Sequence, residues 1–137
     1  MTPDENKAII TRMNKEYIEE GNVDIVYELF DNDFVNQTAP PGLPPGQQGI
    51  IVFFDHILKP AFHNLKVVIH DQIAEGDQVT TRKSYHATHD GEFFGVPASN
   101  KSVIMDIIDI MKLKDGKITD HWGMVDMPGL MAQISTP

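Results

Sequence analysis

The second half of the chain contains four long runs rich in β-branched residues, and these constrain its fold more than any other feature. Two turn signals, Glu75-Gly76-Asp77 and Lys114-Asp115-Gly116, separate the first run from the second and the third from the fourth. Such short connections join antiparallel neighbours, because parallel strands need a long crossover. The sequence therefore predicts a mainly antiparallel sheet, with strands over residues 65–74, 78–88, 102–113 and 117–125.

Helical patterns occupy the first half of the chain. Thr2, Pro3 and Glu5 form a helix start, in which the threonine accepts from free backbone amides and the proline has a preset φ. Helices that precede a sheet, rather than alternate with its strands, indicate the α+β class. We expect three N-terminal helices packed on a curved sheet that encloses a pocket. The expected elements are helices over 2–21, 22–30 and 47–58, a strand over 33–37, a proline-rich loop over 39–46 and a closing helix over 128–134.

Length and composition fit one domain over residues 1–137, since the chain is 41% hydrophobic and 23% charged. The net charge of −9 repels phosphate backbones and argues against a nucleic-acid partner. The chain has no cysteine, and its histidines lack a familiar metal-ligand spacing, so we expect neither metal nor cofactor. Without a long apolar stretch or a secretory signal pattern, no membrane contact is expected and the cytoplasm is favoured.

The strand over residues 103–111 carries apolar side chains on both of its faces. The helices can cover only one face of the sheet, and an apolar face left in water favours association. An identical subunit is the simplest cover for the other face, so we predict a homodimer formed through the sheet.

Motifs in the C-terminal half of the chain resemble the SnoaL-like polyketide cyclase family. Two glycines flank a pair of phenylalanines, a Gly-x-Pro follows, and a Gly-Lys-Ile hairpin leads into a His-Trp strand. The order and spacing of these motifs also match the family, whereas the N-terminal helices match it more loosely. The segments are THDGEFFGVPASNK over 88–101, DGKI over 115–118 and DHW over 120–122.

The resemblance implies the cone-shaped α+β barrel shared with nuclear transport factor 2 and ketosteroid isomerase, generally dimeric and with a deep pocket. For the founding cyclases it implies an intramolecular aldol condensation without metal or cofactor, in which an aspartate removes a proton next to a carbonyl. In an ungapped alignment the family's base aspartate falls at Gly123, and its histidine partner falls at Asp109. The chain therefore departs from the family at two positions that matter for the reaction.

Asp109 and His121 form the sharpest candidate for a catalytic pair. If residues 114–116 form a three-residue turn, Asp109 falls opposite His121 on one face of the sheet. A carboxylate that orients an imidazole makes the ring a competent general base, and the space beside Gly123 is then free for substrate. A structural hydrogen bond at the sheet rim fits the same pattern, and a two-residue turn would separate the two faces.

Other residues are candidates for substrate contacts. His89 matches the histidine of the family motif and either donates a hydrogen bond at the pocket mouth or holds the neighbouring loop. Asn36 and Gln37 precede the proline-rich loop, and Gln37 is expected to orient a ligand. The remaining candidates for the pocket wall are Trp122, Gly123, Tyr17 and Phe34.

Two classes of function stay open. In the first, the chain binds a hydrophobic carbonyl-containing small molecule and catalyses cofactor-free enolate chemistry, an aldol-type cyclisation or an isomerisation, with an altered base. In the second, it is a non-catalytic small-molecule-binding or dimeric interaction module of the same fold. The Asp109–His121 pair favours the first class, and Gly123 at the family's base position favours the second.

Overall fold

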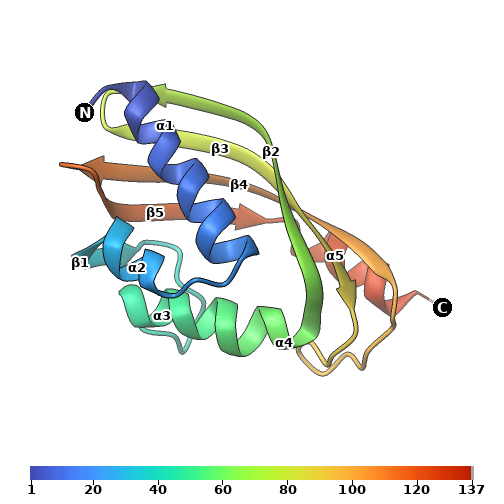
Figure 1. The fold of residues 1–137 in the computed structure, drawn as a ribbon. Helices are drawn as coiled ribbons and strands as arrows, with labels where there is room; N and C mark the ends of the chain where they lie inside the picture. Colours follow the sequence, from blue (N-terminus) through green and yellow to red (C-terminus); the bar gives the residue numbers. More distant parts are fainter. Residues whose placement is uncertain (137) are drawn as a thin grey trace.

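A five-stranded sheet, covered on one face by the N-terminal helices, forms the frame of the computed structural model, which describes residues 1–136 (Figure 1). β1 runs parallel to β5, and all other neighbouring strands are antiparallel. The predicted α+β class and the four long strands are confirmed, and β1 extends the sheet at one edge. In the order β1-β5-β4-β3-β2, the strands are Phe30–Asn36, Lys117–Val125, Ser102–Lys114, Gln78–His89 and Phe62–Glu75.

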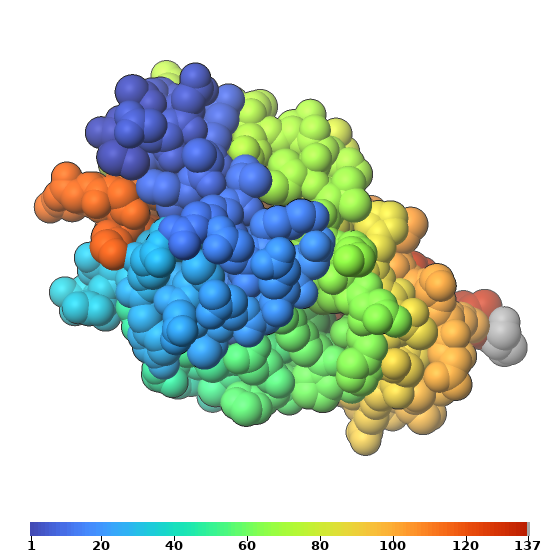
Figure 2. Space-filling model, viewed as in Figure 1, coloured from blue at the N-terminus to red at the C-terminus, as the bar shows by residue number. Residues whose placement is uncertain are grey.

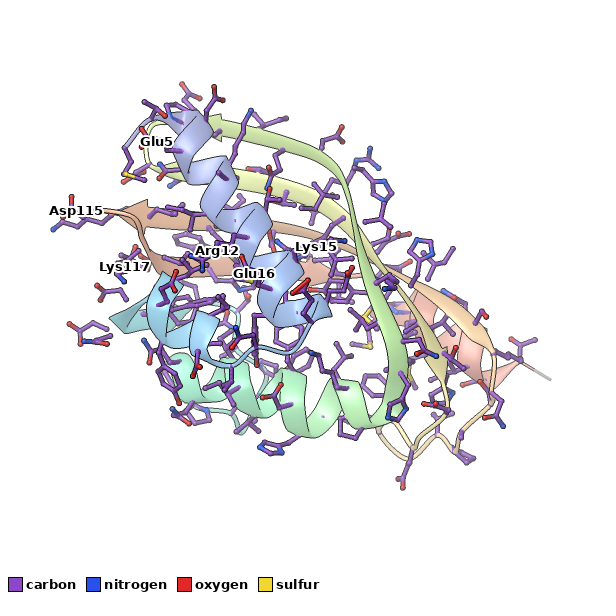
Figure 3. All side chains as sticks on the ribbon, viewed as in Figure 1. Glu5, Arg12, Lys15, Glu16, Asp115 and Lys117 are labelled. Atoms are coloured by element: carbon purple, nitrogen blue, oxygen red, sulfur yellow. The ribbon has the colours of Figure 1, made fainter. Side chains whose placement is uncertain are left out.

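The first helix, α1 (Pro3–Arg12), begins with the predicted capping box. Thr2 Oγ1 accepts from the Glu5 backbone amide, and Glu5 Oε1 accepts from the Thr2 amide, both at 3.1 Å. Glu5 is labelled near the start of this helix in Figure 3. The helix continues directly into the π-helical segment η1 (Met13–Glu19). This continuous helix crosses the sheet diagonally and forms the upper part of the cover (Figure 1).

The next helices along the chain complete this cover, and a last helix lies at the C-terminus. The third helix continues beyond its predicted end at residue 58, because Pro60 lies in the first turn of a short helix, where its missing amide costs no hydrogen bond. In the space-filling view, the blue N-terminal helices and the green third helix form one continuous layer over this face (Figure 2). No helix within residues 1–136 is long and apolar enough to cross a bilayer. These helices are α2 (Asp24–Leu29), the run α3 (Gln47–Ile51), η2 (Val52–Leu58) and α4 (Lys59–Ala61), and α5 (Met127–Ser135).

α5 protects the edge of β4 beyond the end of β5. The Gln133 side chain donates to the Ile104 carbonyl at 2.8 Å and accepts from the Ile104 amide at 2.9 Å. Because an unpaired strand edge leaves backbone groups without partners, this amide replaces the missing neighbour of β4. Asp126 caps the start of α5 by accepting from the Gly129 amide at 3.0 Å.

Burial alternates along β4, so the two faces of the sheet differ sharply. Side chains at odd positions from Val103 to Leu113 are buried beneath the helices. On the opposite face, Ile108 is 53% exposed and Met124 on β5 is 76% exposed. In the monomer the helices therefore cover one face only, and cover of the second face by a partner stays a prediction.

The hairpin between β4 and β5 has a different register from the one expected. Lys114 pairs with Lys117, so Asp115 and Gly116 form a two-residue turn at the hairpin tip, where Asp115 is labelled in Figure 3. Both turn residues have positive φ, 51° and 79°, as a hairpin of the I′ type requires. The three-residue turn, and the direct pairing of Asp109 with His121, were therefore wrong.

A β-bulge in β5 compensates for the shorter turn. Lys112 pairs with Asp120 whereas Leu113 pairs with Ile118, so Thr119 is an extra residue without a partner in the ladder. One inserted residue moves every later side chain of the strand to the opposite face. His121 and Gly123 consequently share the buried face with Asp109, and Asp109 pairs with Gly123.

The proline-rich loop packs tightly onto α3. A Cβ placed on Gly49 would lie 1.8 Å from the Pro44 carbonyl oxygen, whereas one on Gly46 would lie 3.7 Å from its nearest neighbour, Phe34 O. Only glycine allows this close approach of the loop to the helix.

We expect Gly49→Ala to lower the free energy of unfolding by about 1 to 3 kcal/mol, because the added methyl group must displace the backbone at Pro44. Gly46→Ala is the matched control in the same segment and should cost less than about 1 kcal/mol. Urea denaturation of both variants measures the difference. Equal losses of stability would show that the loop does not pack on α3 in this way.

Candidate functional site

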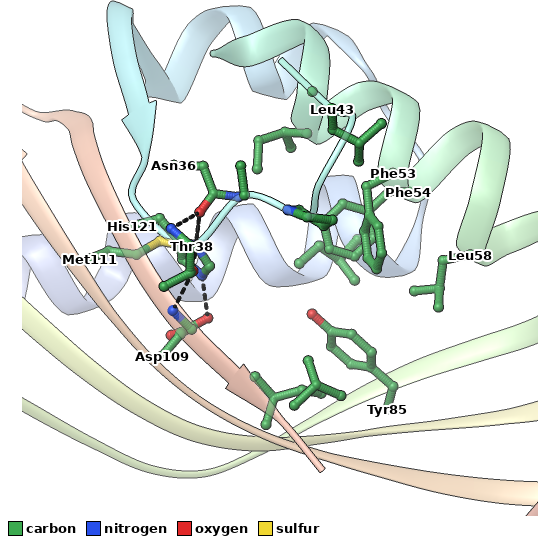
Figure 4. Close-up of a pocket in the computed structure, with 18 of the residues that line it drawn as sticks. Asn36, Thr38, Leu43, Phe53, Phe54, Leu58, Tyr85, Asp109, Met111 and His121 are labelled. Carbon is green, nitrogen blue, oxygen red and sulfur yellow. Dashed lines mark hydrogen bonds and ion pairs between the residues drawn. The ribbon is translucent and has the colours of Figure 1, made fainter. Parts of the chain in front are cut away.

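A cavity of about 130 Å³ lies between the helical layer and the buried face of the sheet (Figure 4). Lys83 and Asp109 are the only charged side chains among the described residues that line it. Three residues that line the cavity are also exposed to solvent: Thr38, Pro44 and Val125. The cavity therefore reaches the surface between the proline-rich loop and the end of β5. Most of the wall is apolar and includes Phe30, Phe53, Phe54, Phe93, Met105 and Met111.

A buried ion pair between β3 and β4 is the central polar feature of this cavity. Lys83 Nζ lies 3.1 Å from Asp109 Oδ2, and the two side chains are 1% and 2% exposed. The ammonium group also donates to Asn14 Oδ1 on η1 at 2.7 Å. The sheet and the helical layer are thus connected through the Lys83 side chain.

The two charges stabilise each other in their ionised forms. Burial alone would raise the pKa of Asp109, but the positive charge of Lys83 outweighs this and holds the pKa below its usual value. Burial likewise acts to lower the pKa of Lys83, and the negative charge of Asp109 outweighs it, so the Lys83 pKa is raised. Both groups are therefore charged at neutral pH.

His121 lies between this ion pair and the loop that follows β1. Its Nδ1 is 3.0 Å from Asn36 Oδ1, and its Nε2 is 3.6 Å from Asp109 Oδ2. Asn36 Oδ1 already accepts from the amide and the hydroxyl of Thr38, at 3.1 and 3.3 Å, which identifies it as the oxygen of the side-chain amide. His121 must therefore donate through Nδ1–H, and the lone pair of the neutral ring is on Nε2.

This tautomer explains why His121 Nε2 and Asp109 Oδ2 are 3.6 Å apart, beyond hydrogen-bond distance. A neutral Nε2 and the Asp109 carboxylate are both acceptors, so no hydrogen bond joins them until Nε2 is protonated. Asp109 Oδ1 has no hydrogen-bond partner among the described residues, although it is buried. The site therefore holds two acceptors beside an apolar cavity.

Gly123 leaves the space that His121 needs. A Cβ at this position would lie 2.7 Å from His121 Cε1 and 2.9 Å from His121 Nε2. Its backbone amide donates to Thr38 Oγ1 at 3.0 Å, which ties β5 to the residues that hold His121. Any larger residue at this position would displace the imidazole from this pose.

The structure brings four of the predicted site residues to the cavity. Asp109, His121, Asn36 and Gly123 line it, and the bulge at Thr119 places His121 beside Asp109 despite the different register. Asn36 contacts His121, so its position is that of a residue that orients the ring.

The other five predicted residues do not line this cavity. Trp122 is on the opposite face of β5 and is 37% exposed, and the Gln37 side chain donates outside the cavity to Asp120 at 3.0 Å. His89 is buried, and its Nδ1 accepts from the Ser99 amide at 3.1 Å, which matches the loop-holding alternative. Tyr17 and Phe34 lie in the core behind the wall.

Lys83, Tyr85 and Asn14 belong to the site but were missed in the sequence. On β3, Lys83 has the same strand parity as the buried residues Val79, Thr81 and Tyr85, so a lysine at an inward position was the available signal. Asn14 had no comparable signal, because it faces Lys83 only through helix packing. Within residues 1–136, no three acidic or histidine side chains gather closely enough to hold a metal ion.

Comparisons with known proteins agree with this architecture. The sequence profile of the SnoaL-like polyketide cyclase family matches residues 8–134. TsrD from Streptomyces laurentii shares the fold with a TM-score of 0.86 and 21% identity, over 98% of this chain and 97% of TsrD. No curated protein matches the chain.

Two further solved structures are similar in sequence as well as in fold. IdmH from Streptomyces antibioticus, for which a polyketide cyclase activity has been suggested, has a TM-score of 0.84 and 26% identity, over 96% of this chain and 99% of IdmH. AclR from Streptomyces galilaeus, for which a hydroxylase activity has been suggested, has a TM-score of 0.84 and 25% identity, over 99% of this chain and 100% of AclR. One fold thus accompanies different suggested activities, so the reaction must be argued from the site.

The charge of Lys83 can be tested through its effect on Asp109. Lys83→Met leaves the carboxylate buried without its partner, and we expect the free energy of unfolding to fall by about 3 to 5 kcal/mol at neutral pH. In the wild type the pKa of Asp109 is lowered, so its stabilising contribution is present above about pH 4 and is lost as the pH falls through the folded-state pKa. In Lys83→Met the pKa of Asp109 should rise instead, because the buried carboxylate has lost its partner. The loss of unfolding free energy should therefore be smaller at acidic pH.

Urea denaturation of both proteins at pH 7 and near pH 4 measures this change. Lys83→Met/Asp109→Leu is the matched control, because removing both charges should restore much of the lost stability. A cost that is the same at the two pH values, with no recovery in the double variant, would contradict the ion-pair interpretation.

Proposed function

The chain belongs to the SnoaL-like polyketide cyclase family, and on this premise we propose that it binds a hydrophobic carbonyl compound and catalyses cofactor-free enolate chemistry. The single observation that carries this proposal is the His121 ring, which offers an unprotonated Nε2 beside a buried, ionised Asp109 in a cavity. A general base needs this combination of a free lone pair and a group that stabilises the charged ring.

The walls of the cavity support an apolar ligand that carries no carboxylate or phosphate group. The only charges of the described wall, Lys83 and Asp109, already compensate each other, which leaves no free cation for a carboxylate or phosphate. An engineered apolar cavity of about 150 Å³ binds benzene, so a cavity of about 130 Å³ accepts one ring of a ligand that extends through the opening.

In the proposed reaction, the bond between the carbon next to the carbonyl and its hydrogen breaks, and the proton moves to His121 Nε2. The electron pair of that bond enters the carbon framework and forms an enolate. The enolate carbon then attacks a second carbonyl to form a carbon–carbon bond, and the proton returns from Nε2 to the new alkoxide. In an isomerisation the proton returns to another carbon instead.

Asp109 contributes most after the proton has moved. The protonated Nε2–H becomes a donor, and the 3.6 Å contact with Asp109 Oδ2 is then close enough to shorten into a charge-assisted hydrogen bond. An interaction that strengthens as the reaction proceeds lowers the barrier rather than only binding the substrate. Lys83 keeps Asp109 ionised, and Asn36 keeps the tautomer that leaves Nε2 free.

The altered base is consistent with the space around Gly123. The resemblance places the family's aspartate at this position, where even a Cβ would collide with the His121 ring. We infer that proton abstraction passes to His121, and that substrate occupies the space which the missing side chain leaves.

A binding protein without catalysis is the second candidate. It is favoured by the loss of the family's base at Gly123, because an apolar cavity with one buried ion pair is sufficient to hold a ligand. The two candidates make different predictions for proton exchange.

The test begins with native mass spectrometry of the protein purified from its own host, followed by denaturing extraction of any copurified molecule. Incubated in D2O with that molecule, or with an apolar cyclic ketone as probe, the wild type should accelerate deuterium uptake next to the carbonyl. His121→Asn should lower this rate by about 10² to 10⁴ fold, the usual contribution of a general base.

Gly123→Ala should also slow the exchange, since its methyl group displaces the imidazole. The control is Gly46→Ala, which changes a glycine of the same chain outside the cavity. Tight stoichiometric binding without any exchange would support the binding protein, and undiminished exchange in His121→Asn would remove the proposed base.

We propose further that the chain forms a homodimer through the face of the sheet opposite the helices. Ile104, Ile108, Trp122 and Met124 lie on this face and are 48%, 53%, 37% and 76% exposed. Large exposed apolar side chains gathered on one surface are typical of an interface. Sedimentation velocity over a broad concentration range should give a dimer, and Ile108→Lys should give a folded monomer; a wild type that stays monomeric would contradict the proposal.

A further inference from the structure

Tyr85 is a polar group of the cavity whose hydroxyl has no assigned role in the proposed proton transfer. It lies on β3, on the same face as Lys83, and its side chain is only 5% exposed. Figure 4 shows its ring rising from the sheet with the hydroxyl directed into the cavity. Among the described residues, this hydroxyl has no hydrogen-bond acceptor, so its proton is available to a ligand.

The surroundings of Tyr85 keep this group a donor. Burial acts to raise the pKa of the phenol, and although the nearby charge of Lys83 acts in the opposite direction, the net effect is a raised pKa. The Lys83 ammonium lies 5.3 Å from the centroid of the Tyr85 ring. A positive charge beside a neutral phenol polarises its O–H bond towards an acceptor.

Three other polar side chains of the cavity already donate to protein acceptors. Lys83 donates to Asn14 and lies against Asp109, Thr38 donates to Asn36, and His121 donates to Asn36. On the sheet side of the cavity, a ligand oxygen therefore finds a free donor at Tyr85. In an apolar site a hydrogen bond to a developing negative charge is much stronger than in water.

We propose that Tyr85 binds the carbonyl oxygen of the ligand and stabilises the negative charge that this oxygen acquires when the neighbouring carbon loses its proton. This inference rests on the proposed function and adds a second catalytic group to it. His121 accepts the proton, the electron pair of the broken carbon–hydrogen bond forms the enolate, and the Tyr85 hydroxyl donates to the enolate oxygen throughout. No further reactant is needed.

The assignment narrows the class of ligand. The carbonyl oxygen must reach Tyr85 on β3 while the acidic carbon reaches His121 on β5, so the compound carries its carbonyl on the ring or chain end that enters the cavity first. Planar compounds whose oxygen carries a negative charge, such as phenolates, imitate the enolate and should bind at the same place.

The test uses 4-nitrophenolate as a probe, because its absorption differs from that of the neutral phenol and reports the bound form directly. Nitrobenzene is the matched probe, with nearly the same shape and without the phenolic oxygen. We expect Tyr85→Phe to weaken binding of 4-nitrophenolate at least about tenfold, as for loss of one hydrogen bond to a charged group, and to leave binding of nitrobenzene within about twofold. Tyr27→Phe, a tyrosine that is 51% exposed on α2, is the control variant for the wild-type affinities.

The outcomes separate this inference from the proposed base. The role of Tyr85 is wrong if Tyr85→Phe binds 4-nitrophenolate as tightly as the wild type does. It is also wrong if the variant loses affinity for both probes to the same extent. Neither outcome affects the deuterium-exchange result for His121→Asn. Absence of 4-nitrophenolate binding by the wild type would overturn the role of Tyr85 as well. On any compound that the wild type exchanges, Tyr85→Phe should lower the rate by about 10² to 10³ fold, the effect of removing one donor to an oxyanion.

Discussion

The ion pair between Lys83 and Asp109 is the interaction on which the polar end of the cavity depends. Two charges that are 1% and 2% exposed are tolerated only because each compensates the other at 3.1 Å. Lys83 also donates to Asn14, so this pair joins the sheet to the helix that covers it. Because Lys83 keeps Asp109 ionised, the carboxylate can accept a hydrogen bond from the His121 ring once that ring is protonated.

The geometry around His121 links the backbone to the proposed chemistry. The bulge at Thr119 turns His121 towards Asp109, and the absent side chain of Gly123 leaves space for the ring. Asn36, held by Thr38, determines which ring nitrogen carries the proton. A carboxylate at position 123 and a histidine in this pose would compete for the same volume, which is consistent with the proposal that His121 takes over the role of an acid at this position.

The apolar wall and the few polar groups have separate roles. The phenylalanine and methionine side chains exclude water and accept a range of flat ligands. Lys83, Asp109, His121 and Tyr85 are the polar groups on which the proposed chemistry depends, and in an apolar setting their interactions are stronger than they would be in water. Proteins of this fold, such as IdmH and AclR, carry different suggested activities, which is expected when a shared cone surrounds a small set of exchangeable polar residues.

The sequence by itself determined the elements of this protein, because turn residues, helix caps and apolar periodicity act between residues that are close in the chain. The capping box at Thr2, the four long strands and the family motifs were all readable in this way. Only the tertiary structure decided the register of the last hairpin, where one extra residue, Thr119, exchanges the two faces of a strand without leaving a local signal. It also decided that Asn36 contacts His121, that Trp122 faces away from the cavity, and that Asn14 reaches Lys83. These outcomes depend on packing between segments far apart in the chain, and no local pattern encodes which side chains such packing will bring together.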